Sequence, residues 1–150
     1  MPERQEFVSY NFALIICRHP ETGKFLAVNE TKNRGWWIPG GAVDSGETFR
    51  QGAHRECMEE AGIKIELKGI LKVEYYMSKH NQGKMRVIFY AEPVDPNQIP
   101  KQVADSESLE ARWVSLEEFK QLDHIRGDEL LIFGAMAEQG KIASMDFFEE

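Results

Sequence analysis

Several features that mark particular classes of protein are scarce in this chain of 150 residues. It has only two cysteines, Cys17 and Cys57, and no CxxC pair, so a thiolate zinc site or a dithiol redox motif has no support. We expect both cysteines to be buried, reduced thiols. The longest apolar run, Phe12 to Cys17, is too short to span a bilayer, and the first residues lack the layout of a signal peptide. These absences predict a cytoplasmic protein with no membrane partner.

Clustered positive charge is also lacking. The chain has 18 Lys and Arg against 25 Asp and Glu, a formal net charge of −7. Proteins that bind nucleic acid polymers usually carry a basic patch, so we expect no such partner. A protein of this charge that handles phosphate groups needs a bound divalent cation to neutralise them. The length suits one domain over residues 1–150, and both a monomer and a homodimer are compatible with the composition.

The order of apolar and turn-forming segments predicts a layered α+β fold, with strands packed between helices. Strands are expected over 8–17, 24–28, 36–38, 65–76, 84–92 and 111–114, and the first two should form a hairpin. Helices are expected over 48–61, 116–122 and 128–139. Capping boxes open the first helix at Thr48 and Gln51 and the second at Ser115 and Glu118. Residues 93–110 form a long loop, which in a compact domain is often functional.

The first predicted helix has two chemically different faces. Its apolar residues recur at every fourth position and should pack on the sheet: Phe49, Ala53, Cys57 and Ala61. Glu56, Glu59 and Glu60 are related by i, i+3 and i, i+4, so they share an adjoining face. A solvated acidic surface is the alternative interpretation. It is weakened because the trio borders the apolar stripe and a glycine-rich loop precedes the helix.

Carboxylates at this density are good oxygen ligands for Mg²⁺ or Mn²⁺. Such a cation can bridge phosphate oxygens and orient a water molecule for attack. Gly40, Gly41 and Gly46 can adopt backbone angles that other residues avoid, which lets the main chain approach a metal or a phosphate closely. They would equally make a tight connection between a strand and the helix.

These residues resemble the Nudix box: Gly, five residues, Glu, seven residues, Arg-Glu, an apolar residue, any residue, Glu-Glu, any residue, Gly and an apolar residue. Here the motif comprises Gly41, Glu47, Arg55-Glu56, Cys57, Met58, Glu59-Glu60, Ala61, Gly62 and Ile63. All of its fixed positions are filled. Cys57 departs mildly from the pattern, because a larger aliphatic residue is usual there. The chain is therefore similar to the Nudix hydrolases.

The resemblance implies an α/β/α sandwich, with a mixed β-sheet between helices, and hydrolysis of a nucleoside diphosphate linked to another moiety. Carried over by position, Glu56, Glu59 and Glu60 would bind Mg²⁺, with Mn²⁺ as a substitute. Either Glu56 or Glu59 would double as a general base. The carbonyl of Gly40 or Gly41 would add a metal ligand.

Three box residues would support these ligands. The resemblance implies that Arg55 orients the carboxylates through Glu47 and Glu59, a role at once catalytic and structural. Gly62 would end the helix.

Some Nudix enzymes take a further catalytic acid from a loop after the box. By distance from Trp113, the resemblance favours Glu107 first and Glu110 second, and a solvated loop acid is an equally good interpretation of either.

The box does not specify the substrate. We expect Trp36, Trp37, Tyr75 and Tyr76, with the loop 77–83, to line a cleft that faces the helix, where aromatic rings can stack on a base. Strand alternation places at least one of the two tryptophans in the core.

Segments 35–39, 86–90 and 105–113 resemble the Nudix branch that hydrolyses 8-oxoguanine nucleoside diphosphates. ADP-ribose, nucleotide sugars and dinucleoside polyphosphates are alternative substrates. ADP-ribose fits less well, because Ser78-Lys79 stands where a proline is usual. A Nudix-like module that binds a nucleotide without cleaving it is the alternative of another class, and the intact box acids argue against it.

Overall fold

Two β-sheets and three α-helices make up the computed structural model, which describes residues 3–150. The strands are β1 (Ser9–Cys17), β2 (Phe25–Glu30), β3 (Gly35–Trp37), β4 (Gly40–Ala42), β5 (Ile65–Met77), β6 (Gly83–Pro93) and β7 (Ser108–Val114). The helices are α1 (Phe49–Ala61), α2 (Leu116–Lys120) and α3 (Glu129–Glu138), followed by a 3-10 turn, η1 (Met145–Phe147). One sheet has the strand order β4-β1-β6-β5 and the other has β3-β2-β7.

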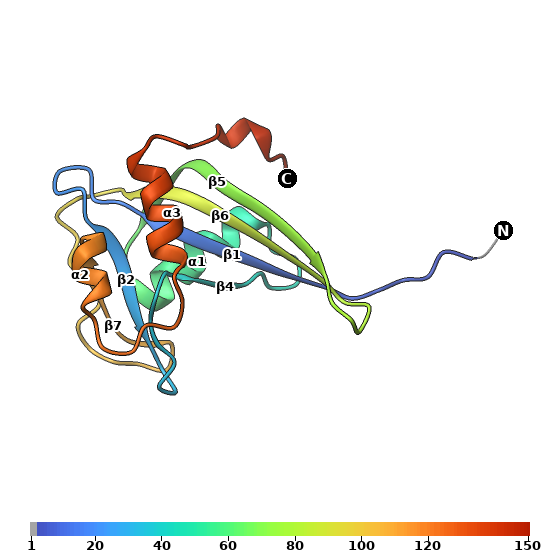
Figure 1. Cartoon of the computed structure of the whole chain (residues 1–150), viewed down its shortest axis with the longest axis horizontal. Coiled ribbons are helices and arrows are strands. Elements are labelled where there is room, and N and C mark those ends of the chain that lie inside the picture. Colours follow the sequence, from blue (N-terminus) through green and yellow to red (C-terminus); the bar gives the residue numbers. More distant parts are fainter. Residues whose placement is uncertain (1–2) are drawn as a thin grey trace.

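Helices α1 and α3 pack on opposite faces of the β1–β6 sheet (Figure 1). Successive residues of β1 serve the two sides: Ile15 belongs to the core under α1, and Leu14 belongs to the core under α3. β1 is parallel to β6, whereas β4 and β5 run antiparallel to their neighbours. The sheet is therefore mixed, and the structure confirms the predicted layered α+β fold.

The predicted hairpin between the first two strands is wrong. β1 lies between β4 and β6, and β2 lies between β3 and β7, so only the isolated bridge Arg18–Phe25 joins β1 to β2. The turn redirects the chain from one sheet to the other. The Nδ1 of His19 accepts the backbone N–H groups of Glu21 and Thr22, both at 3.2 Å. β2 and the second half of β1 are buried on both faces, and both strands take their partners from later parts of the chain.

Two strand boundaries also differ from the prediction. Gly40–Ala42, expected to be only part of a turn, forms β4 against β1. A Cβ on Gly40 would lie 2.6 Å from the carbonyl oxygen of Ala13, and φ is 149° there, so the strand requires glycine at this position. β7 begins at Ser108 instead of Ala111, because Ser108 still pairs with Glu30 of β2 beyond a bulge at Leu109.

The local predictions for α1 are confirmed. The Thr48 hydroxyl accepts the Gln51 N–H at 3.1 Å, and the Gln51 side chain accepts the Thr48 N–H at 2.9 Å, which is a complete capping box. Gly62 ends the helix with a left-handed φ of 67°. Cys17 and Cys57 are buried free thiols. Within residues 3–150, no helix is long and apolar enough to cross a membrane.

Candidate active site

The acidic face of α1 is turned toward the strand β4. Because the apolar stripe of the helix packs on the sheet, Glu60 is drawn into the interior, where it is 5% exposed. Its Oε1 accepts the backbone N–H of Gly40 at 2.9 Å. A Cβ on Gly41 would lie 2.7 Å from Oε1 of Glu56, so a side chain at this position would push the carboxylate out of its place. Gly40 and Gly41 thus let the backbone of β4 approach the carboxylates of Glu60 and Glu56 closely.

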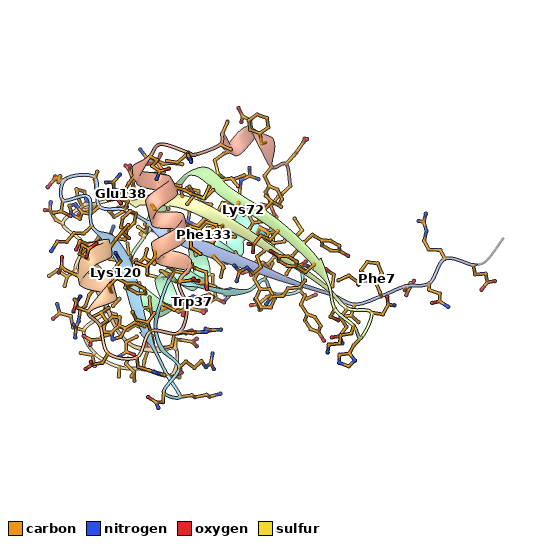
Figure 2. The ribbon with its side chains drawn as sticks, viewed as in Figure 1. Phe7, Trp37, Lys72, Lys120, Phe133 and Glu138 are labelled. Carbon is orange, nitrogen blue, oxygen red and sulfur yellow. The ribbon has the colours of Figure 1, made fainter. Side chains whose placement is uncertain are left out.

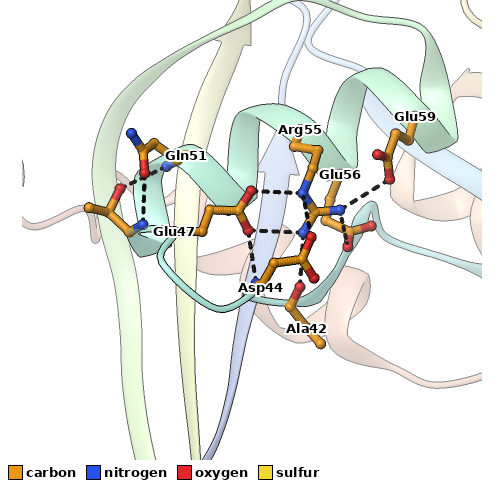
Figure 3. A network of polar contacts seen from close by, with 8 residues as sticks. Ala42, Asp44, Glu47, Gln51, Arg55, Glu56 and Glu59 are labelled. Atoms are coloured by element: carbon orange, nitrogen blue, oxygen red, sulfur yellow. Dashed lines mark hydrogen bonds and ion pairs between the residues drawn. The ribbon is translucent and has the colours of Figure 1, made fainter.

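Arg55 joins the other carboxylates of the box into one network (Figure 3). Its guanidinium donates to Glu47 at 2.8 and 3.0 Å, to Glu56 at 2.9 Å and to Glu59 at 3.1 Å. It also donates to the carbonyl oxygen of Ala42 at 3.0 Å. The planar fork of an arginine suits several acceptors at once. Arg55 therefore fixes the carboxylates relative to the β4 backbone.

The carboxylates differ in their protonation chemistry. Burial raises the pKa of Glu60 well above its usual range, and the nearby Glu56 adds to the effect against the opposing Gly40 N–H. Burial also raises the pKa of Glu56, although its hydrogen bond from Arg55 acts the other way. Hydrogen bonding to Arg55 lowers the pKa of Glu47. Ionisation of both Glu56 and Glu60 is therefore disfavoured in the protein alone, and a cation placed between them would offset this cost.

The long loop before β7 is fastened to the end of α1. The hydroxyl of the fully buried Ser108 donates to the carbonyl oxygen of Glu60, and the Lys101 ammonium donates to that of Glu59. Asp105 Oδ1 accepts the backbone N–H groups of Glu107 at 2.9 Å and of Ser108 at 3.2 Å. These contacts hold the loop tip, with Glu107, over the acidic face of the helix.

An acidic pocket of about 250 Å³ results, whose lining includes Glu56, Glu60 and Glu107 beside Gly40 and Gly41. The structure therefore brings together two box acids, the glycine pair and the loop acid favoured by the sequence. Glu59 accepts from the same Arg55 nitrogen as Glu56 (Figure 3), but it is not among the residues that line this pocket. Glu110, the second candidate, pairs instead with Arg112 at 2.9 Å.

The four aromatic residues expected at the substrate site are dispersed. Trp37 lines a cleft beside the acidic pocket. Trp36 points the other way along β3, is 5% exposed and is covered by the guanidinium of Arg112. Tyr75 and Tyr76 lie outside both cavities, because this end of β5 projects from the body with β6, and they are 53% and 57% exposed.

The neighbouring cleft has a volume of about 380 Å³ and shares Glu30, Arg34, Gly40 and Gly41 with the acidic pocket. Its further lining includes Phe12, Trp37, Lys84, Arg86, Arg126 and Glu129. Apart from the glycine pair and Trp37, we did not predict these residues from the sequence. The row of alternate residues on β1 and β6 is a signal that could have suggested Phe12 and Lys84. Nothing local pointed to Arg126, which reaches Glu30 from 96 residues away.

The donor set of the acidic pocket fits a hard divalent cation, since carboxylate and carbonyl oxygens are its preferred ligands. Among the described residues, no three acidic, imidazole or thiol side chains lie close enough together to form a preformed metal site. Mg²⁺ seldom needs one, because it commonly takes one or two carboxylates and completes its shell with water and substrate phosphates. Glu56 and Glu60, which line the pocket, would be its ligands from α1, with Glu59 held next to Glu56 by Arg55.

Comparisons with known proteins agree on the family. The model of the NUDIX domain matches residues 10–132. The phosphatase NudJ of Escherichia coli is 32% identical over 115 residues, which cover 75% of this chain and 73% of NudJ. A NUDIX hydrolase from Nitrosomonas europaea superposes with a TM-score of 0.71 at 21% identity, covering 95% of this chain and 97% of that one. An ADP-ribose pyrophosphatase from Streptococcus suis has a TM-score of 0.63 at 20% identity, with 87% and 92% covered. The chain belongs to the Nudix hydrolase family and is a Nudix pyrophosphohydrolase.

Proposed function

We propose that this protein hydrolyses the diphosphate bond of a nucleoside diphosphate derivative in a reaction that depends on Mg²⁺. The observation that carries the proposal is the acidic pocket, where Glu56 and Glu60 of α1, the Gly40–Gly41 backbone and the loop acid Glu107 converge. Residues from both sheets and from α1 build this pocket, which supports one catalytic unit over the chain.

Glu56, Glu59 and Glu60 are the proposed metal-binding acids, with a backbone carbonyl of the glycine pair. A bound Mg²⁺ would neutralise the diphosphate and lower the pKa of a coordinated water. Arg55 keeps Glu56 and Glu59 in place, as its contacts at 2.9 and 3.1 Å support.

Glu107 is the general base that the geometry supports best. Glu107 lines the pocket, and the hydrogen bonds of Arg55 go to other acids, Glu59 among them. In the proposed reaction, Glu107 takes a proton from the attacking water as the new P–O bond forms. The bond between the attacked phosphorus and the bridging oxygen breaks, and that oxygen leaves with the electron pair as part of the other phosphate group.

Oxidised guanine nucleotides are the first substrates to test, followed by ADP-ribose, diadenosine polyphosphates, FAD and nucleotide sugars. Phosphate release should be measured for each compound with Mg²⁺ and with Mn²⁺. At least one compound should be cleaved only when a divalent cation is present.

Glu60→Gln tests the metal site. We expect kcat to fall at least about a hundredfold, because losing one ligand removes several kcal/mol of charge stabilisation. Glu117→Gln is the matched control, since Glu117 is exposed on α2 and pairs only with Lys120. Near-native activity of Glu60→Gln would place the metal elsewhere. Tight nucleotide binding without turnover across the whole panel would favour the non-catalytic module.

A further inference from the structure

The outer edge of β5 is covered along its first half only. β5 stands last in the strand order β4-β1-β6-β5, so β6 is its one neighbour in the sheet among residues 3–150. The segment after α3 covers the first half, where Ile70 donates to the carbonyl oxygen of Ala143 at 2.9 Å and accepts the Ala143 N–H at 2.8 Å. No strand or bridge within the described chain adjoins the outer side of residues 73–77, which we call the free edge.

The free edge is accessible because this part of the sheet projects from the body (Figure 1). Figure 2 shows Phe7 near the projecting end and Lys72 where β5 leaves the body. Residues 3–8 lead into β1 on the opposite side of β6, where the Val8 carbonyl accepts the Gly83 N–H at 2.8 Å. The backbone of the free edge is therefore open to a strand of another molecule.

Apolar side chains dominate the free edge. Those of Val73, Tyr75, Tyr76 and Met77 are 48%, 53%, 57% and 50% exposed. Edge strands of soluble proteins usually carry charges, prolines or bulges that discourage pairing with another sheet. Here the one charged residue is Glu74, whose side chain is 11% exposed and is held by Arg86 at 2.7 Å, and the bulges of β5 lie before Val73. The free edge thus lacks the features that keep sheets apart.

The order of these side chains is symmetric about Tyr75, which favours a second copy of this chain as the partner. Two identical strands that pair antiparallel are related by a two-fold axis perpendicular to the sheet, so one residue lies opposite itself. With Tyr75 at the axis, Val73 lies opposite Met77 of the second copy, and Glu74 lies opposite Tyr76. Every directly opposed pair of the free edge is then apolar or contains a single charge, which cross-strand pairing tolerates.

Other positions of the axis are less favourable. An axis at Glu74 would set two carboxylates directly opposite each other, which destabilises a strand pair. An axis at Val73 would direct the second copy to Ile70, where Ala143 already occupies the edge. An axis at Tyr76 would leave a shorter pairing, because β5 ends at Met77. The symmetric register at Tyr75 is therefore the one that uses the whole free edge.

We propose that the free edge of β5 is an interface at which two copies of this chain pair antiparallel, with Tyr75 opposite Tyr75 of the second copy. The two β1–β6 sheets then form one continuous sheet. Four half-exposed side chains of this size leave roughly 100 Å² each, or about 800 Å² over both copies, which is at the low end for a specific interface. We therefore expect a reversible dimer with a Kd of about 10–100 µM. The interface does not depend on which bond the acidic pocket cleaves.

Tyr75→Cys is the first test. Cys17 and Cys57 are fully buried, so the introduced thiol is the one open to mild oxidation. Directly opposed residues of an antiparallel pair have Cα atoms about 4.5–5.5 Å apart, which a disulfide can span. We expect Tyr75→Cys to form linked dimers at least about tenfold faster than Tyr10→Cys, because pairing holds its two thiols together. Tyr10 is 51% exposed on β1 and is the matched control. Equal rates for the two variants would overturn the proposal.

Val73→Cys tests the register. The two copies of Val73 lie four residues apart along the paired strands, about 13 Å, which is too far for a disulfide. Val73→Cys alone should therefore link no faster than Tyr10→Cys, whereas an equal mixture of Val73→Cys and Met77→Cys should link rapidly into a mixed dimer. Rapid linking of Val73→Cys alone would overturn the register at Tyr75.

Tyr75→Lys tests the interface without a covalent bond. Two ammonium groups would face each other across the axis, and the fold should tolerate the change because Tyr75 is half exposed. In sedimentation experiments on the full chain, we expect the Kd of the dimer to rise at least about tenfold for Tyr75→Lys and to stay at the wild-type value for Tyr10→Lys. Unchanged association of Tyr75→Lys would place the interface elsewhere and overturn the proposal. A wild-type chain that stays monomeric at every concentration would also overturn it, and would leave the free edge to a strand of another protein.

Discussion

Replacing Arg55 tests the architecture of the active site most directly. Breaking a buried ion pair costs about 3–5 kcal/mol, whereas an exposed pair contributes about 0–1 kcal/mol. The Arg55 side chain is 26% exposed, and its partners Glu47 and Glu56 are 15% and 13% exposed. For Arg55→Ala we therefore expect the free energy of unfolding to fall by about 2–3 kcal/mol, between these limits.

Urea denaturation of the metal-free protein measures this loss, and kcat should fall about a hundredfold in parallel because Glu56 and Glu59 lose their common anchor. Arg55→Lys should recover part of the stability but little of the activity, because one ammonium cannot bridge Glu47, Glu56 and Glu59 as a planar fork does. Lys120→Ala, which removes an exposed pair at 2.9 Å, is the control and should cost less than about 0.5 kcal/mol. If Arg55→Ala unfolded at the same urea concentration as this control, the reasoning would be refuted.

Three further outcomes follow from the packing. Burial raises the pKa of both thiols, Cys17 and Cys57, so an aromatic disulfide reagent should label neither in the native protein at pH 8 and both after denaturation; fast native labelling would contradict this. Ser108→Ala should lower the free energy of unfolding, measured in urea, by about 1 kcal/mol, because the buried hydroxyl anchors the loop to α1. It should also lower kcat by displacing Glu107, and an unchanged kcat would show that this anchor does not contribute to catalysis. Gly69→Ala should lower the free energy of unfolding by about 1–3 kcal/mol, because the new Cβ would lie 2.2 Å from a methyl carbon of the segment after α3. That segment should then become accessible to limited proteolysis, and a wild-type digestion pattern would show that it is not packed there.

The sequence specified α1 and its two faces because these features are local. The 3.6-residue period places Ala53, Cys57 and Ala61 on one side and Glu56 and Glu60 beside them, and both ends of the helix are set by residues within one turn. The spacing therefore placed Glu56, Glu59 and Glu60 on one adjoining face before any partner of the helix was known.

The sequence predicted the partners of the strands less well. Glycine at positions 40 and 41 is compatible with a turn, and it forms a strand only because β1 offers its edge there. The predicted hairpin of β1 and β2 was wrong for the same reason. A short connection favours a hairpin, whereas a partner such as β6 is distant in the sequence and leaves no local pattern that reveals the pairing.

By itself the sequence indicated the class of enzyme, because the box acids, Arg55 and the glycine pair lie within one short stretch of chain. Only the tertiary structure decided what surrounds that stretch. It brought Glu107 to the pocket through Ser108, removed Trp36 to the core, and joined Trp37 to Glu129 across 92 residues. The cleft beside the acidic pocket is made of such long-range contacts, and its side chains show no periodicity in the sequence that would mark them as neighbours.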